Sequence, residues 1–196
     1  FPLLAVESDC IVSKDADITV AFEVELPELF TVTSAEYAAI HAAWCKAVKV
    51  LPDYTVVHKQ DWFVKEHYRS RTEGEKLGFL SRSYELHFNE RPFLNHCCYL
   101  YLTKTTKERM RMQSSFSSLC RGFIIPKEVN RDTAARFLDA AGQFARIVND
   151  TGLVRLRRLS GDEVTGTEEQ SGLLEKYLCL SLEDTGTLED IELGDE

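Results

Sequence analysis

No run of apolar residues in this chain approaches the roughly 20 that a membrane-spanning helix needs. The opening stretch, FPLLAVESDC, lacks both the basic start and the long apolar segment of a signal peptide. The chain also begins with Phe1 instead of methionine, so we expect it to be a piece of a longer protein. The first two absences predict a chain without a transmembrane segment or a signal peptide.

A Gly-Lys dipeptide is also absent, which bears on the one stretch that looks like a phosphate-binding loop. In SGDEVTGTEEQSGLLEKYL, residues 160–178, Gly161 and Gly166 are separated by four residues and Thr167 follows. A working loop of this kind needs a Lys directly after the second glycine to neutralise phosphate charge. Acidic residues would crowd the phosphate here instead. We expect loop glycines before a helix, with Thr167 and Gln170 at capping-box spacing, and no nucleotide site.

The cysteines contain no C-x-x-C pair, and Cys97 and Cys98 are adjacent, which suits neither a mutual disulfide nor a tetrahedral metal site. The NHCC stretch, residues 95–98, could be read as a zinc site with His87 or His58 as further ligands, but buried cysteine is commonly a small hydrophobe. We therefore expect free, reduced thiols, no metal and no cofactor. The six are Cys10, Cys45, Cys97, Cys98, Cys120 and Cys179.

Negative charge is concentrated at the end of the chain. The net charge is −9, but residues 183–196 hold seven acidic residues and no Lys or Arg, so the rest carries only −2. Such a run is typical of a solvated linker. We expect one α+β domain over residues 1–182 and an acidic linker over 183–196.

Hydrophobic periodicity predicts the elements of that domain. A hairpin (10–26) is followed by a helix with a Thr33–Glu36 capping box, which Pro52 stops. Then come a strand (54–68), a helix (77–92), a strand (94–104), a helix from near Asn130 to Gly152, a strand (153–160) and a helix that contains residues 173–178. This order predicts a mainly antiparallel sheet with helices packed on one face, and it fits a ferredoxin-like split βαβ sandwich.

Each long helix has an apolar stripe that we expect to face the core. We also expect His41 and Cys45, which flank the first stripe, to be packing residues. The stripes are Tyr37, Ile40, Trp44, Val48 and Leu51 in the first helix, Phe79, Leu80, Tyr84 and Phe88 in the second, and Ala134, Phe137, Leu138, Ala141, Phe144, Ala145 and Val148 in the third.

A polar stretch between the strand at 94–104 and the third helix is too long for an ordinary connection. Its basic residues are interleaved with apolar ones, and Glu108 is the single acid among them. This pattern suits binding to an acidic partner or to nucleic acid. The alternative is a solvated loop. We single out as possible partner-binding residues Lys104, Lys107, Arg109, Met110, Arg111, Met112, Phe116 and Arg121.

Five stretches of the chain closely resemble the start of the TraG conjugation ATPases of Bacteroides-type conjugative transposons, which are similar to the traffic ATPases of type IV secretion. The resemblance extends from Phe1 to about Leu182. The stretches are FPLLAVE, KDADITVAFEVELPELFTVTSAEY, LPDYTVVHKQDWFVKE, HFNERPFLNHCCYLYLTKTTKERMRMQSSFSSLC and IIPKEV.

This resemblance implies the amino-terminal, non-catalytic domain of a longer ATPase, with ATP bound beyond Glu196 and residues 183–196 as the stub of a linker. No residue matches a Walker motif, so no catalytic role is carried over. We expect a docking or assembly domain at the cytoplasmic face of the inner membrane, with other conjugation proteins as partners and self-association as an open alternative. The second hypothesis is a nucleic-acid contact module that uses segment 104–121 with Arg155, Arg157 and Arg158; an independent enzyme is disfavoured.

Overall fold

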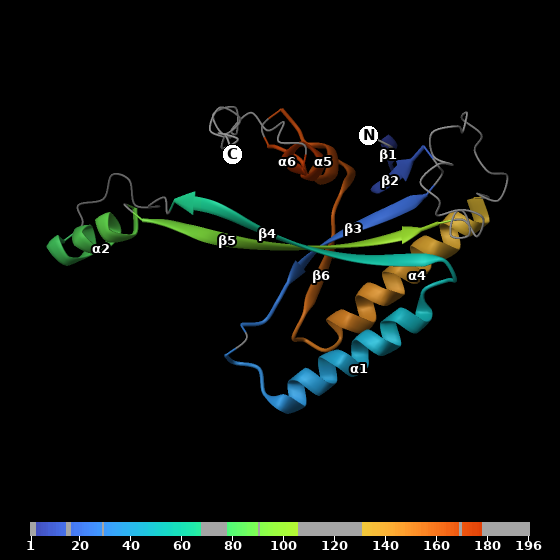
Figure 1. The fold of residues 1–196 in the computed structure, drawn as a ribbon, viewed down its shortest axis with the longest axis horizontal. Helices are drawn as coiled ribbons and strands as arrows, with labels where there is room; N and C mark the ends of the chain where they lie inside the picture. The colour runs from blue at the N-terminus through green and yellow to red at the C-terminus, as the bar shows by residue number, and fades with distance from the viewer. Residues whose placement is uncertain are drawn as a thin grey trace, which may run out of the picture.

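The computed structural model describes residues 3–14, 17–28, 30–67, 78–89, 91–105, 131–168 and 170–177. Within them the chain forms an antiparallel sheet and five helices, which confirms the predicted α+β class (Figure 1). The elements are β1 (Leu3–Glu7), β2 (Cys10–Ser13), β3 (Ile18–Glu25), α1 (Ser34–Val50), β4 (Thr55–His67), α2 (Phe79–Asn89), β5 (Pro92–Lys104), α4 (Arg131–Asn149), β6 (Arg155–Arg158), α5 (Gly161–Thr165) and α6 (Leu173–Tyr177).

The main sheet has the split βαβ topology that the element order predicts. β3, α1, β4, β5, α4 and β6 occur in this order in the chain, with α2 inserted between β4 and β5. The strands lie in the spatial order β6-β3-β5-β4 with every pair antiparallel. Each βαβ unit therefore leaves a gap between its two strands, and a strand of the other unit fills it. Two consequences matter below: β3 lies in the middle of the sheet, and β4 lies at its edge.

The N-terminal hairpin is longer than predicted. β2 and β3 pair as expected, but β1 adds a further strand through a two-residue turn at Ser8 and Asp9. Both turn residues have positive φ, 51° and 59°, as tight hairpin turns require. Sequence reasoning missed this hairpin because Ser-Asp is not one of the Asn-Gly or Asp-Gly pairs that usually mark such turns.

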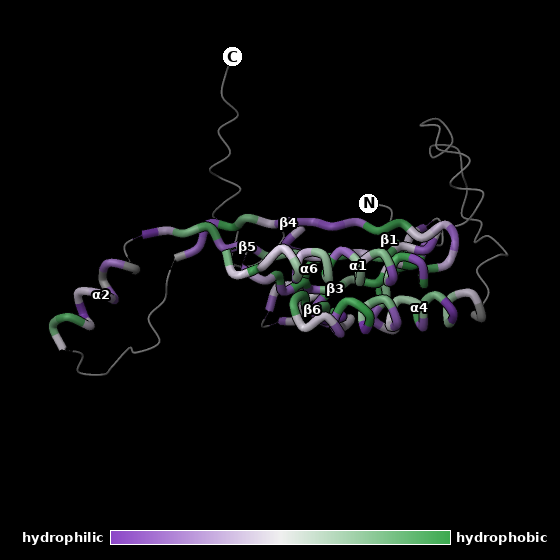
Figure 2. Tube along the Cα trace, turned by 90° about the horizontal axis from the view of Figure 1, so that it is seen from below, coloured by the Kyte–Doolittle hydropathy of each residue, from purple (hydrophilic) through white to green (hydrophobic). Residues whose placement is uncertain are grey.

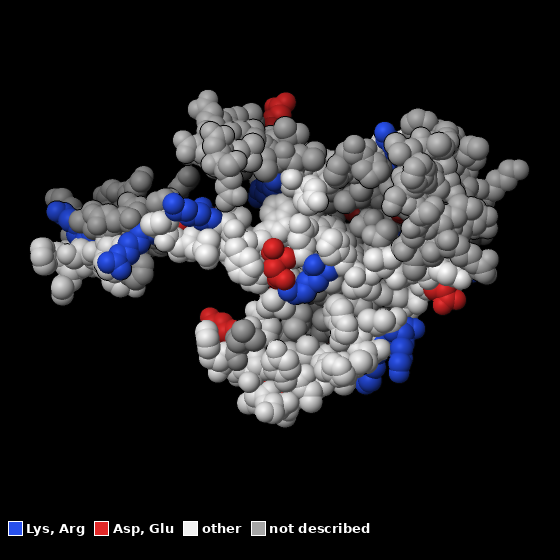
Figure 3. All heavy atoms as spheres, viewed as in Figure 1, with Lys and Arg blue, Asp and Glu red and all other residues white. Residues whose placement is uncertain are grey.

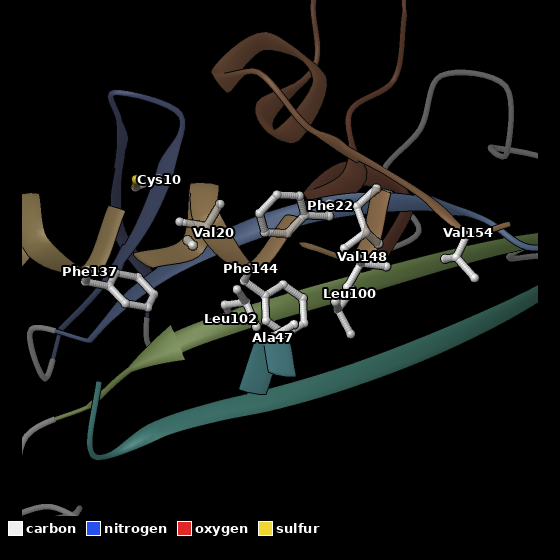
Figure 4. Packing of buried hydrophobic residues seen from close by; sticks show 12 residues of the cluster. Cys10, Val20, Phe22, Ala47, Leu100, Leu102, Phe137, Phe144, Val148 and Val154 are labelled. Atoms are coloured by element: carbon white, nitrogen blue, oxygen red, sulfur yellow. The ribbon is translucent and has the colours of Figure 1, made fainter. Parts of the chain in front are cut away.

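One face of the sheet packs against α1 and α4 and forms the main core. Figure 4 shows Phe137, Phe144 and Val148 of α4 beside the side chains of β3 and β5, among them Leu100 and Leu102. The edge of the Trp44 ring meets Phe144, with ring centroids 5.4 Å apart. The predicted inner stripe of α4 is confirmed, since its side chains are buried or pack against this core, apart from half-buried Ala134.

The predicted stripe of α1 is only partly correct. Its capping box is present, with Thr33 Oγ1 accepting from the Glu36 amide and the Glu36 carboxylate accepting from the Thr33 amide. Ala47 is the fully buried residue, and Val48, about 100° further round the helix, is exposed. The buried stripe therefore runs through Ile40, Trp44, Ala47 and Leu51.

Three other residues of α1 were predicted to pack inward, but they lie off the observed buried stripe. Tyr37 lies in the first turn and is exposed. His41 and Cys45 lie on the outer side of the helix and are exposed, with Nε2 of His41 3.9 Å from Sγ of Cys45.

The opposite face of the sheet is covered in part by α5 and α6, so the helices do not all lie on one face as expected. Leu159, Val164 and Leu173 form a second apolar cluster with Ala21, and Tyr99 and Tyr101 pack against it. The helix α5 begins at a Ser160–Glu163 capping box. Sequence reasoning missed this helix because it has only five residues and looks like part of a glycine-containing loop.

Candidate functional site: a projecting arm

The β4–β5 pair extends well beyond the rest of the sheet and carries α2 near its tip (Figures 1 and 2). The last residue pair between β3 and β5 is Val24 with Cys98, whereas β4 and β5 stay paired out to His67 and Pro92. We call the part beyond this point the arm. It comprises Trp62–His67 of β4, Pro92–Cys97 of β5 and the helix α2.

The arm is exposed on both of its faces. Every side chain from Phe63 to Glu66 is exposed, and so is every one from Arg91 to Leu94. Because successive residues of a strand alternate between faces, each of these runs contributes to both faces. A two-stranded ribbon without cover on either face is only marginally stable in water.

Large apolar side chains make up much of this exposed surface. On α2, the side chains of Phe79 and Leu80 are 83% and 81% exposed. On the strands, those of Phe63 and Leu94 are 67% and 69% exposed, and these two share the sheet face that α1 and α4 cover further along. Tyr84, Val64 and Phe93 are further exposed apolar residues of the arm. These side chains are spread over both faces of the ribbon and over α2. Exposed apolar surface of this kind is typical of an interaction site.

The predicted inward orientation of α2 is therefore wrong. Phe79, Leu80 and Tyr84 face outward, and the Phe88 side chain lies outside the described residues. The physical reason is position: α2 connects the two strands at the far end of the arm, where the described residues hold no core for it to cover. An apolar stripe on a helix predicts that something covers the stripe, but it does not say which molecule does.

A polar cluster lies where the arm leaves the body, on the face that carries Phe63. One oxygen of the Asp61 carboxylate accepts a hydrogen bond from Nζ of Lys59. The other oxygen lies 2.9 Å from Nε2 of His96. The His96 ring stacks on Phe63 with centroids 4.8 Å apart. These contacts join neighbouring strands across the base of the arm. The Lys59 ammonium and the His96 imidazole lower the pKa of Asp61 from its ordinary 3.8 to about 2.

Cys98 lies beside Asp61, so the cluster contains the residue types of a Cys–His–Asp nucleophilic site. However, burial raises the pKa of the Cys98 thiol to about 11, and the neighbouring Asp61 carboxylate adds to the shift. A thiol of this pKa stays protonated near neutral pH, whereas nucleophilic catalysis requires the thiolate. The arrangement therefore serves as a polar joint and has no activated nucleophile.

The comparisons with known proteins concern the N-terminal part of the chain. A family profile described as "Domain of unknown function, B. Theta Gene description (DUF3875)" matches residues 1–42. These residues include β1, β2, β3 and the first half of α1, so the chain is similar to this Bacteroides family over its N-terminal hairpins and the start of α1. No curated protein matches the chain.

Of the predicted partner-binding residues, only Lys104 belongs to the described part of the chain. Its Nζ donates to the carbonyl oxygens of Asp53 and Thr105, both at 2.8 Å, and it lies 5.5 Å from the centre of the Tyr54 ring. Lys104 thus fastens the end of β5 to the turn before β4. The other seven lie outside the described residues: Lys107, Arg109, Met110, Arg111, Met112, Phe116 and Arg121.

The arginines of the nucleic-acid hypothesis are engaged within the chain. Arg157 donates to Glu23 and to Glu163, both at 2.6 Å. Arg158 donates to the carbonyl oxygens of Ser8 and Asp9 at 3.0 and 3.2 Å, which ties the first hairpin turn to β6. Arg155 lies 3.8 Å from Glu25.

The stretch with phosphate-loop spacing borders a hollow of about 190 Å³ between the sheet and the last two helices. Its walls include Glu23, Asp162 and Glu163, and the Gly161 amide already donates to Asp9 Oδ1 at 2.6 Å. The glycines have a packing role: a Cβ atom on Gly172 would lie 2.1 Å from the Gly166 nitrogen. Acidic walls and an amide already engaged by a carboxylate do not suit a phosphate. The absence of a nucleotide site stays a prediction.

The capping interaction predicted for this stretch is half formed. The Thr167 hydroxyl accepts from the Gln170 amide at 3.2 Å, but the helix starts only at Leu173.

The other motifs bring no ligand set together among the described residues. The described residues hold no group of three His, Cys, Asp or Glu side chains that could bind a metal, so His58, His87 and the 95–98 stretch do not converge. The thiols of Cys10, Cys97 and Cys98 are buried or half-buried, and Cys45 is exposed, contrary to the packed setting expected for it. None of the described helices is long and apolar enough to cross a membrane.

Proposed function

We propose that this chain is a non-catalytic docking domain of a conjugative-transfer ATPase, and that the arm is the surface that meets a partner protein of the transfer apparatus. The observation that supports the proposal is the set of exposed apolar side chains on a ribbon and helix that project from the body. The resemblance to the TraG ATPases supplies the biological setting. In this setting the chain works at the cytoplasmic face of the inner membrane, and a further domain binds ATP.

Exposed apolar area of this size has a free-energy cost that a partner would remove. Full burial of a Phe or Leu side chain contributes about 1.5–3 kcal/mol. The four most exposed apolar side chains of the arm would together supply most of the stabilisation of a specific complex, since a few buried anchors dominate interface energies. They are Phe63, Phe79, Leu80 and Leu94. A partner would also stabilise the ribbon itself.

The charges around these side chains indicate the chemistry of the partner. Lys65, Arg82 and Arg91 are exposed on the arm, and Figure 3 shows Lys and Arg side chains along it. The Glu66 carboxylate accepts from Asn95 at 3.1 Å. We expect a partner surface with an apolar centre and an acidic rim, because complementary charges speed encounter and exclude wrong partners.

The alternative, a nucleic-acid contact module, has less support. Arg157 and Arg158 are engaged with their own chain, and the remaining cations of segment 104–121 other than Lys104 lie outside the described residues. A phosphate-binding surface needs several available cations. Nucleic-acid binding by this segment stays a prediction.

The sharpest test changes Phe79 and Leu80 to Ser in the full-length protein. We expect retention on apparatus proteins of the same element to fall about tenfold or more, as for the loss of hot-spot side chains. Conjugative transfer should fall with it, while the melting temperature of the isolated 196-residue chain stays close to that of the wild type.

The matched control is Phe30→Ser, which removes an exposed phenylalanine, 94% accessible, outside the arm. This variant should bind and transfer normally. Normal transfer by the Phe79, Leu80 double variant would contradict the proposal, and equal losses in both variants would show that the effect is not specific to the arm.

A further inference from the structure

The outer edge of β4 is the longest open strand edge in the described part of the chain. β4 pairs with β5 over its whole length, from Thr55 to His67, in one unbroken register, and it ends the strand order of the sheet. Figure 2 shows β4 along the margin of the molecule with no described element beside its outer side. A long, regular edge with unpaired backbone groups is a template for a further strand.

We propose that this edge pairs with β4 of a second copy of the chain, antiparallel and centred on Gln60, to give a two-fold dimer with one continuous sheet. The inference does not rest on the proposed function, because it uses the strand edge and not the apolar residues of α2. The argument rests on how the β4 sequence, TVVHKQDWFVKEH, complements itself.

Antiparallel geometry restricts the possible registers. Directly opposed residues either both form interstrand hydrogen bonds or both do not, and this property alternates along a strand. A symmetric β4 pair must therefore be centred on a residue, and opposed side chains lie on the same face.

The charges on β4 then separate the central registers. A centre at Asp61 places that carboxylate opposite itself, and a centre at Trp62 places Lys59 opposite Lys65. A centre at Phe63 sets Asp61 opposite Lys65, but it pairs only Lys59–His67 of each strand. Like charges directly opposite each other are destabilising, so the first two registers are disfavoured.

The register centred on Gln60 matches side chains along its whole length. On the face of the core under α1 and α4, Lys59 lies opposite Asp61 of the second copy, and Val57 lies opposite its Phe63. On the other face, Val56 meets Val64, and His58 meets Trp62. Gln60 meets its own copy on the axis. The paired segment is longer, from Thr55 to Lys65.

This arrangement also addresses the weakness of the arm. Residues 63–65 lie in the uncovered ribbon, and in the dimer they gain the body end of the second β4 as a third strand. A third strand removes the marginal stability of a two-stranded ribbon. A surface patch used by both copies is the usual basis of a two-fold dimer.

Mixing two charge variants tests the register in a way that changes within one chain cannot imitate. The variant Asp61→Lys carries lysine at both positions 59 and 61, so lysine opposes lysine when two copies of it pair. The variant Lys59→Asp carries aspartate at both positions, so aspartate opposes aspartate. We expect wild type to sediment at twice the 22.3 kDa of one chain. Each variant alone should lose the dimer, and an equimolar mixture should regain it.

The outcomes separate the alternatives. In the register centred on Phe63, the mixture places a lysine at position 61 opposite Lys65, and these like charges oppose pairing. The register centred on Gln60 instead pairs opposite charges on both sides of the axis in the mixed dimer. A mixture that stays monomeric therefore overturns the proposal. A monomeric wild type overturns it too. The matched control is Asp150→Lys, an identical charge change on an exposed residue after α4, which must leave the dimer intact. Loss of the dimer in this control would show a general charge effect and would also overturn the proposal.

A second measurement does not depend on charge. Gln60→Cys places two thiols next to each other on the axis, where opposed Cβ atoms lie about 4.5–5.5 Å apart. Mild oxidation should then link the two chains covalently in this variant. The wild type, which keeps the exposed Cys45, is the reference. A failure of Gln60→Cys to form more cross-linked chain than wild type counts against the register.

Discussion

Leu94 and Leu102 lie on the same strand and on the same face of the sheet, yet 69% of Leu94 is exposed and Leu102 is fully buried. The difference is what lies above them. Over Leu102 the helices α1 and α4 close the core, whereas beside Leu94 the strand pair has left the body and forms the arm. One strand thus contributes both to the stability of the fold and to a surface that can bind. The comparison shows that strand sequence alone does not tell core from interface.

The largest expected difference between these regions is in stability. Phe144→Ala should lower the free energy of unfolding by about 3–5 kcal/mol, because it leaves a cavity beside Trp44 in the closed core. Phe79→Ala in the arm removes the same ring from water and should change that free energy by less than about 0.5 kcal/mol. Urea unfolding of both variants checks the contrast. A large loss for Phe79→Ala would mean that α2 is packed after all.

A smaller effect is expected at the joint between the two regions. Because contact with Lys59 and His96 lowers the pKa of Asp61 to about 2, the charged form is stabilised in the folded chain. The contribution is present above the unfolded pKa of 3.8 and is lost as the pH falls toward 2. Because the Asp61 carboxylate is well exposed to solvent, this contribution to the free energy of unfolding should stay below about 1 kcal/mol.

Asp61→Asn should remove this pH dependence. Hydrogen exchange of the β4 and β5 amides at several pH values between 2 and 5 measures it, and Asp53→Asn serves as the control for a carboxylate on the loop before β4. Arm exchange that stays equally sensitive to pH in Asp61→Asn would assign the effect to another group.

The smallest effect on stability is expected outside both regions. Changing Lys107, Arg109 and Arg111 together to Ala should leave the melting temperature nearly unchanged, since surface charges usually contribute less than about 0.5 kcal/mol. The same change should impair conjugative transfer if segment 104–121 faces an acidic partner. Wild-type transfer would reject that interface, and a large fall in melting temperature would instead show that the segment is structural.

The sequence predicted the body better than the arm, and the reason is physical. The α4 stripe repeats at helical spacing and meets a sheet, so Phe137, Phe144 and Val148 are placed correctly. The α2 stripe is just as apolar, but periodicity reports only that a face is suited to burial. The position of α2 depends on how far β4 and β5 run past Val24, which is a tertiary property. The unusual length of the strand predicted at residues 54–68 was the one sequence signal that pointed to the arm.

The central position of β3 also has a consequence for how the chain is made. β3 ends at Glu25, and its neighbour β2 precedes it, but its other neighbours β5 and β6 begin only at Pro92 and Arg155. At the usual 5–20 residues per second of translation, the stretch from Glu25 to Arg155 takes on the order of ten seconds to emerge. Until the whole stretch has emerged, β3 can pair with β2, but Val20 and Phe22 lack the complete core, including α4, that finally buries them. The ribosome must therefore deliver most of the domain before the core around its first long strand can close.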